Sequence, residues 1–240
     1  MSQNYSIQVY NNSDQLQNYV LFQTVNVPSG QPNVFANVYQ SSGIIESGTY
    51  SQVTFQMANE YYAVCGTNPA PLGDHVRVTT GSAVPVTLSS GETPPETPGT
   101  LCVMSTTDGE YPHWASVTQT QNTEPSAFCI SCDGSFNYPT PTNIFIGTGV
   151  QDPVSKHIIP VATVPASPSS NFYFQPIVKY HIGTGEFEAG TVVNITEIGP
   201  VLDVDFTQLP ENSAVYTQGR NGEYTPGAPS DDAVRGHEKK

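Results

Sequence analysis

Two pairs of side chains in this sequence place a histidine beside a cation, at a spacing that suits acid–base chemistry. His75 and Arg77 alternate with valines in one predicted strand, and Lys179 and His181 alternate with apolar residues in another. Residues two apart in a strand point to the same face of a sheet. Because imidazole titrates near neutrality, such a pair could polarise a carbonyl group or move a proton. These four residues are our catalytic candidates, and an outward polar sheet face is the alternative.

Aromatic residues are the candidates for ligand contact. The chain has 13 Tyr, 10 Phe and 1 Trp, and Tyr and Trp combine an apolar ring with a hydrogen-bonding group. His113 and Trp114 lie in a turn-rich stretch, where the indole could stack on a sugar or a planar ligand, or else cap the core. The remaining ligand-binding candidates lie in predicted strands: Tyr61, Tyr62 and Tyr180.

The four cysteines do not form a recognised motif. Cys129 and Cys132 have the CxxC spacing, but a redox motif needs its first cysteine at a helix N-terminus, and the residues before Cys129 predict a strand. A zinc site would need a second pair at similar spacing. We expect buried free thiols, and a bridge between Cys65 and Cys102 is the alternative.

Other chemical signatures are missing from the sequence. It has no GxSxG turn, no HExxH helix, no Gly-rich phosphate loop and no EF-hand spacing, so no cofactor and no metal site are expected. Asp203 and Asp205 share one face of a predicted strand. They could bind calcium with loop carbonyls, but a solvated sheet face is the simpler explanation.

The elements that must position these residues are predicted to be strands. Gly and Pro number 20 and 21, and charged residues make up only 12% of the chain, which favours short strands joined by turns. Alternation with period two recurs along the chain. The clearest runs are residues 6–10, 19–22, 53–57, 75–79, 84–88, 172–174, 177–182, 191–195 and 202–206. The sequence therefore predicts an all-β sandwich or barrel.

A weak internal repeat organises these strands, with an offset of roughly 110 to 120 residues. The matched segments are 6–10 with 126–130, 33–35 with 143–145, 53–56 with 172–175, and 61–67 with 179–184. We therefore predict two related antiparallel β-sandwich halves, residues 1–105 and 106–217. From residue 218 the apolar pattern ends, which predicts a disordered C-terminal tail over 218–240.

Charge narrows the possible partners. The formal net charge is −14, and such a field repels phosphates, so neither nucleic acid nor an anionic membrane is an expected partner. A homo-oligomer is possible. No signal peptide or spanning segment is visible, which predicts a cytoplasmic protein, or a secreted one if a signal was removed.

Two strings carry a resemblance to a known group. Residues 4–13, NYSIQVYNNS, and 61–67, YYAVCGT, resemble fungal all-β proteins without an assigned activity, and the likeness covers most of residues 1–217. The resemblance implies a fungal origin and transfers no catalytic residue.

Three functions stay open at this point. The first is a binding protein that holds a small-molecule or glycan ligand, either a sugar or an apolar compound, at an aromatic-rich sandwich. The second is a cofactor-independent cyclase or isomerase of fungal natural-product biosynthesis, with its pocket between the two halves. The third is a structural or interaction module.

Overall fold

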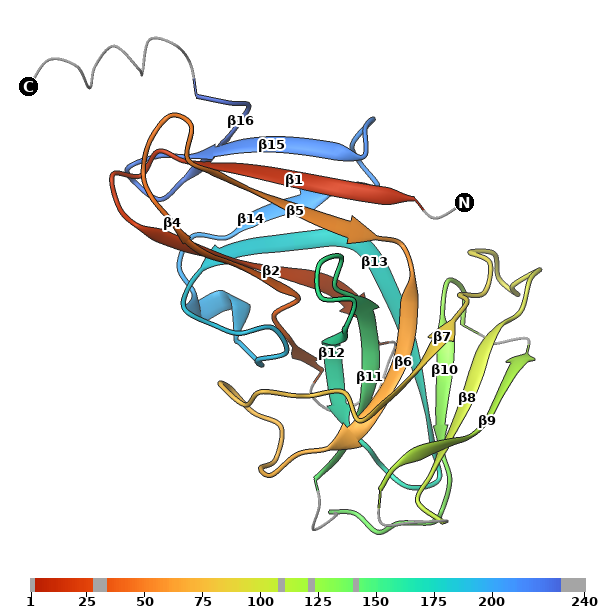
Figure 1. The fold of residues 1–240 in the computed structure, drawn as a ribbon. Coiled ribbons are helices and arrows are strands. Elements are labelled where there is room, and N and C mark those ends of the chain that lie inside the picture. Colours follow the sequence, from red (N-terminus) through yellow and green to blue (C-terminus); the bar gives the residue numbers. More distant parts are fainter. Residues whose placement is uncertain (1–2, 28–33, 108–110, 121–123, 140–142, 230–240) are drawn as a thin grey trace, which may run out of the picture.

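The protein is built almost entirely of strands, as the sequence predicts. The computed structural model describes residues 3–27, 34–107, 111–120, 124–139 and 143–229 (Figure 1). In this part of the chain the only helix is a 3₁₀ turn, Ile195–Glu197, which Asn194 caps. No helix in the described residues is long and apolar enough to cross a membrane.

The strands form three sheets. From one edge to the other, the first contains β16 (Tyr224–Pro226), β15 (Ser213–Gln218), β1 (Asn4–Asn11) and β5 (Gln52–Ala58). In the same order, the second contains β4 (Gln40–Ile45), β2 (Gln17–Asn26), β13 (Ser170–Thr184), β10 (Phe128–Cys132), β8 (Gly99–Ser105) and β9 (His113–Thr120), and β14 (Leu202–Asp205) pairs with β13. The third contains β3 (Phe35–Ala36), β12 (Ile158–Pro165), β11 (Ile144–Gln151), β6 (Tyr61–Thr67) and β7 (Ser82–Val86).

The strand pairings of β10–β16 repeat those of β1–β9 in the same chain order. β1 pairs antiparallel with β5 as β10 pairs with the first part of β13, and the hairpin β2–β4 corresponds to β11–β12. β7 pairs with β6 as β14 pairs with the second part of β13, and β8–β9 corresponds to β15–β16. Three of the four predicted sequence matches follow this correspondence. The fourth, residues 33–35 with 143–145, does not, because β11 takes the place of β2 and not of β3.

The two sets of strands are interlocked. β15 lies parallel to β1, and β8 lies parallel to β10. β6 pairs with β11, and β2 pairs with β13. Each of these pairings joins one half of the chain to the other, as Figure 1 shows for the long β13. Each of the three sheets therefore contains strands from both sides of the boundary predicted between residues 105 and 106. The strand correspondence places the start of the second half after β9.

Two large apolar clusters fill the interior, and each takes side chains from both halves of the chain. One contains Tyr180, Tyr61 and Phe206, and the other contains Phe128, Phe174 and the buried cysteines. Two smaller clusters lie on the opposite faces, around Phe22 and around Phe145. Burial of one such side chain contributes about 1.5–3 kcal/mol, so these faces hold the strands in register.

Two predicted strands are absent. Residues 75–79 form a loop with a single bridge between Arg77 and Thr191, because His75 has a φ of 63° that breaks the extended chain. Residues 191–195 make two isolated bridges and then enter the 3₁₀ turn.

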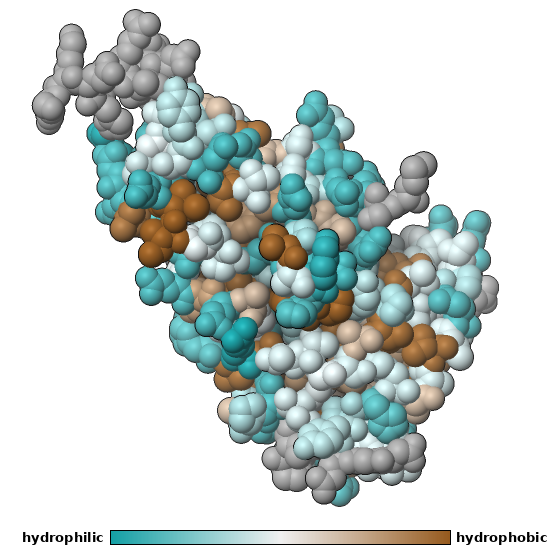
Figure 2. All heavy atoms as spheres, in the orientation of Figure 1, coloured by the Kyte–Doolittle hydropathy of each residue, from teal (hydrophilic) through white to brown (hydrophobic). Residues whose placement is uncertain are grey.

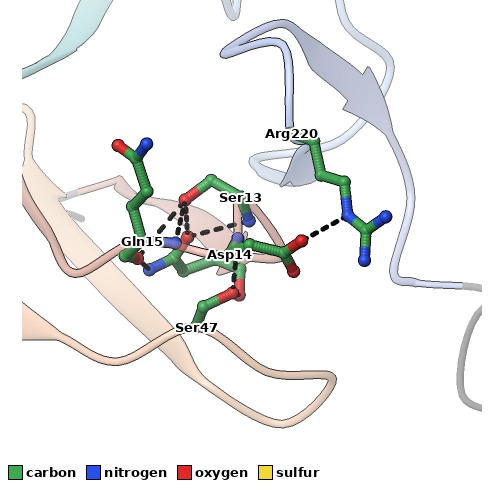
Figure 3. Close-up of polar contacts among 6 residues, drawn as sticks. Ser13, Asp14, Gln15, Ser47 and Arg220 are labelled. Atoms are coloured by element: carbon green, nitrogen blue, oxygen red, sulfur yellow. Dashed lines mark hydrogen bonds and ion pairs between the residues drawn. The ribbon is translucent and has the colours of Figure 1, made fainter. Parts of the chain in front are cut away.

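The first part of the predicted disordered tail is ordered. Gln218 ends β15 and accepts a 2.7 Å hydrogen bond from the Tyr19 hydroxyl, and Tyr224 of β16 packs against the core. Arg220 forms an ion pair with Asp14 at 2.5 Å (Figure 3). The tail prediction is therefore wrong for residues 218–229, because these contacts supply the burial that the sequence pattern did not show. Residues 230–240 lie outside the described residues.

A buried amide anchors the turn to which Arg220 binds. Asn11 is fully buried and donates hydrogen bonds to the carbonyls of Gln15, Ile45 and Glu46. Its Oδ1 accepts bonds from Ser13, and the amide of Asp14 donates to Ser47 (Figure 3). One side chain thus holds the β1–β2 turn against the loop that follows β4.

Candidate functional site

His181 lies between a carboxylate and a hydroxyl on one face of the seven-stranded sheet. Its Nδ1 is 2.5 Å from Asp203 Oδ1, and its Nε2 is 2.8 Å from Thr24 Oγ1. An ionised carboxylate can only accept, so Nδ1 carries a hydrogen, and in the neutral imidazole Nε2 accepts the hydrogen of the Thr24 hydroxyl. The side chain of His181 is 19% exposed and that of Asp203 is 63% exposed. We call these residues the Thr24–His181–Asp203 group.

Three neighbouring strands position the group. Asp203 of β14 lies directly opposite His181 of β13. On the other side His181 opposes Phe22 of β2, so Thr24 is its diagonal neighbour, within reach of a long side chain. The pairing is irregular beside it, where Thr24 alone faces residues 177–179. Such bulges redirect side chains and occur often beside active sites.

The first half of the chain has a position that corresponds to His181 but carries no titratable side chain. The predicted match sets residues 66–67 of β6, Gly-Thr, against residues 183–184 of β13, also Gly-Thr. In this alignment Val64 is the counterpart of His181. Both lie on the face of their strand that is opposite the large core cluster, beside Phe145 and Phe22 respectively.

The counterparts of the polar group are apolar. Val64 opposes Ala83 of β7, where His181 opposes Asp203. In the place of Thr24 stands Gly149, on which a Cβ would lie 2.8 Å from Val64 Cγ1. The same strand arrangement therefore forms with apolar contacts at these positions, and the fold does not require the polar group.

Lys179 lies on the same sheet face as His181. It opposes Asp205 in the register of β13 and β14. Hydrogen bonds from Thr207, together with the charge of Lys179, hold the pKa of Asp205 below its usual value. Among the described residues no group of three metal-ligating side chains comes together, at the two aspartates or elsewhere.

The other predicted catalytic pair makes polar contacts of its own. Arg77 forms an ion pair with Glu188. His75 lies 3.7 Å from Asp74 and stacks on Phe187, with 5.6 Å between ring centroids. No hydrogen bond or ion pair found in the described chain links this pair to Lys179 or His181. The two predicted pairs therefore share no direct polar contact in the described residues.

Two of the predicted ligand-binding tyrosines are core residues. Tyr180 and Tyr61 are 1% and 5% exposed, and burial raises the pKa of both phenols, that of Tyr61 to about 12. The Tyr61 hydroxyl accepts a hydrogen bond from Gln23 at 3.3 Å. Tyr62 is half-buried and, with Tyr61, borders a cavity of about 430 Å³.

His113 and Trp114 lie at the start of a strand and not in a loop. β9 begins at His113, which lies opposite Ser105 of β8. The Trp114 ring packs against the Phe128 cluster, as in the core-capping alternative, and its Nε1 is buried without a hydrogen-bond partner in the described part of the chain. The ring is therefore mainly a core contact.

A second cavity of about 430 Å³ opens at the seam between the two halves. One wall comes from β1 and β5, and the other from the turn after β11. The Tyr39 hydroxyl holds that turn by a 3.0 Å hydrogen bond to the Gln151 carbonyl. The polar side chains around the cavity are those of Asn4, Tyr5, Ser6, Gln56, Glu60, Gln151 and Lys156. Glu60 also borders the cavity of Tyr61 and Tyr62, so the two lie on either side of the β5–β6 turn.

Of the Thr24–His181–Asp203 group, the sequence analysis named only His181 as a catalytic candidate. It treated Asp203 as a possible calcium ligand and did not single out Thr24. The alternation of residues 202–206 with 177–182 could have suggested that the two strands pair. No local signal joins Thr24 to His181, which lies 157 residues away.

Exposed apolar side chains do not identify a partner surface. Figure 2 shows separate hydrophobic patches divided by hydrophilic side chains on the face in view. Exposed large apolar residues in the described chain include Leu16, Ile44, Tyr50 and Val154. A homo-oligomer therefore stays a prediction.

Comparison with known proteins gives a family and no activity. No curated protein and no solved structure matches the chain. The fungal origin implied by the sequence resemblance stays a prediction. The RhiA family model matches residues 2–225, nearly the whole described chain, and the protein therefore belongs to the RhiA family.

Proposed function

We propose that this protein binds a sugar or a related polyol in the seam cavity between β1, β5 and the turn after β11. The observation that carries the proposal is the composition of this cavity. Amide, hydroxyl and charged side chains, with Met57, Ala58 and Pro153 between them, surround a volume of about 430 Å³, which is within the range of small-molecule sites. Amides both donate and accept hydrogen bonds, as the hydroxyl groups of a sugar do.

The neighbouring cavity suits an apolar substituent on such a ligand. Its lining is Tyr61, Tyr62, Pro85, Val86 and Leu88, together with Asn59, Glu60 and Thr87. A glycoside could place its sugar in the seam cavity and an aromatic or aliphatic group beside Tyr62. This arrangement would use both ligand types expected from the sequence.

Binding measurements on the full chain test the proposal. A glycan array identifies a ligand, and calorimetry then compares the wild type with Gln56→Ala and Glu60→Gln. Loss of one or two hydrogen bonds should weaken binding about tenfold. Thr54→Ala is the matched control, because Thr54 is an exposed residue of β5 that does not line the cavity. Silence across the array, or equal affinities of all variants, would reject the proposal.

A cofactor-independent acid–base enzyme is the second candidate function. The Thr24–His181–Asp203 group favours it, because Asp203 fixes the imidazole tautomer that can take a proton. The absence of polar counterparts in the other half of the fold supports a role beyond stability. Replacement of His181 should then abolish turnover, whereas replacement of His75 should not.

A further inference from the structure

We propose that Thr24 is a nucleophile for acyl transfer, with His181 as its general base and Asp203 as the residue that positions the base. The inference rests on the second candidate function above. It adds the attacking atom and the substrate class, an ester or another activated acyl compound.

The hydrogen bonds point in the direction that this chemistry needs. Asp203 accepts from His181 Nδ1 at 2.5 Å, which leaves a lone pair on Nε2. Thr24 Oγ1 lies 2.8 Å from that nitrogen. A nucleophilic hydroxyl is weak until an adjacent base takes its proton, and a third group that orients the base completes the arrangement.

Each step of the reaction is balanced by these groups. Thr24 Oγ1 attacks the acyl carbon, and its proton moves to His181 Nε2. The bond from the acyl carbon to the leaving oxygen then breaks, and that oxygen takes the proton from Nε2 as an alcohol departs. Water attacks the Thr24 ester in the same way, releasing a carboxylic acid and restoring the hydroxyl. The sum is ester plus water to acid plus alcohol.

Lys179 is placed to offset the negative charge that develops on the acyl oxygen. It lies on the same face as His181, two residues earlier, within the segment of β13 that Thr24 faces. A cation near a developing oxyanion lowers the barrier. Asp205 lies opposite Lys179 in the sheet and offsets part of the charge of its ammonium group.

Two observations bear on whether this group serves only stability. The duplicated strands hold Val64, Ala83 and Gly149 at the corresponding positions, so the polar residues are not needed to build this part of the sheet. The group also reaches the surface, since Thr24 and His181 are half-buried and Asp203 is 63% exposed. A buried network that served stability alone would be closed to a substrate.

The test uses the full-length protein with 4-nitrophenyl acetate as the probe. We expect rapid release of one equivalent of nitrophenol and one acetyl group on the protein, which peptide mapping by mass spectrometry places on Thr24. Thr24→Val should remove the adduct, and His181→Gln should slow its formation about 100-fold or more. Thr54→Val is the control, because it removes an exposed strand hydroxyl from a different sheet, away from His181. Circular dichroism confirms that each variant is folded.

Asp203→Asn tests whether Asp203 positions the His181 imidazole, by a measurement that does not depend on protein stability. The asparagine amide can donate to Nδ1, so the imidazole hydrogen should shift to Nε2, and the nitrogen chemical shifts of His181 should report the reversed tautomer. Asp133→Asn is the control, because Asp133 also accepts a side-chain hydrogen bond, from the Ser135 hydroxyl and not from a histidine. An unchanged tautomer in Asp203→Asn would overturn the role given to Asp203.

The outcomes distinguish this inference from the function on which it rests. The Thr24→Val variant could still be acetylated, at another residue, in a reaction that depends on His181. This result would overturn the role of Thr24 as nucleophile and keep His181 as the base. Acetylation that is unchanged by both Thr24→Val and His181→Gln would overturn both. Adducts confined to surface lysines would do the same.

Discussion

Burial determines the chemistry of the four cysteines at the residue scale. All four are free and buried, and three of them, Cys65, Cys102 and Cys132, pack in one cluster with Phe128. Burial raises the pKa of these three thiols to about 12, and that of Cys129 to about 11. Thiolates are the reactive form, so the CxxC pair in β10 is a buried strand contact and not a redox motif.

These thiols should make the protein sensitive to alkali. Their pKa is raised in the folded state from an ordinary value of 9.0, so their contribution to stability is complete below pH 9 and is lost as the pH rises toward 12. The free energy of unfolding in urea should fall across this window, and Cys102→Ala should show a shallower fall. At neutral pH a thiol reagent should modify the cysteines only after unfolding. A flat stability profile above pH 9 would contradict the prediction.

At the element scale, alternation predicted the strands that have one buried and one open face. β1, β5 and β14 follow it residue by residue. β11 was not predicted, because seven of its eight residues are buried on both faces and leave no period of two. β9 was missed for the opposite reason, since both of its faces are largely exposed.

The candidate site was only partly predictable for a related reason. Alternation along one strand put Lys179 and His181 on one face. The partners Thr24 and Asp203 come from other strands, and the register that joins them is a long-range property. Residues 75–79 alternate between polar and apolar side chains but do not form a strand, because the positive φ of His75 turns the chain.

The C-terminal strand gives a prediction at this scale. Truncation after Gln218 removes β16, the packing of Tyr224 and the Arg220–Asp14 ion pair. We expect a loss of about 2 kcal/mol or more, mostly from the buried ring, seen as a lower melting temperature. Truncation after residue 229, which keeps β16, is the control against which this loss is measured. Equal values for the two truncations would show that β16 contributes nothing to stability.

At the scale of the whole molecule, the duplication produces an interlocked protein instead of two domains. Each half supplies strands that complete the sheets of the other, through β1 with β15, β8 with β10, β6 with β11 and β2 with β13. Such exchange between related units resembles domain swapping within one chain. It also creates the seam at which the proposed ligand cavity lies, since one wall comes from each half.

Interlocking predicts how the chain responds to division between residues 120 and 124. A fragment of residues 1–120 leaves β1, β2, β6 and β8 each without one hydrogen-bonded neighbour, so exposed strand edges and uncovered apolar faces should keep it from folding alone. Residues 124–240 should fail for the same reason. Mixed or co-expressed, the two fragments should recover the dispersed NMR spectrum and the cooperative unfolding of the intact chain. Cooperative unfolding of either fragment by itself would mean that the halves are independent domains. The strand pairs between the halves would then contribute little to stability.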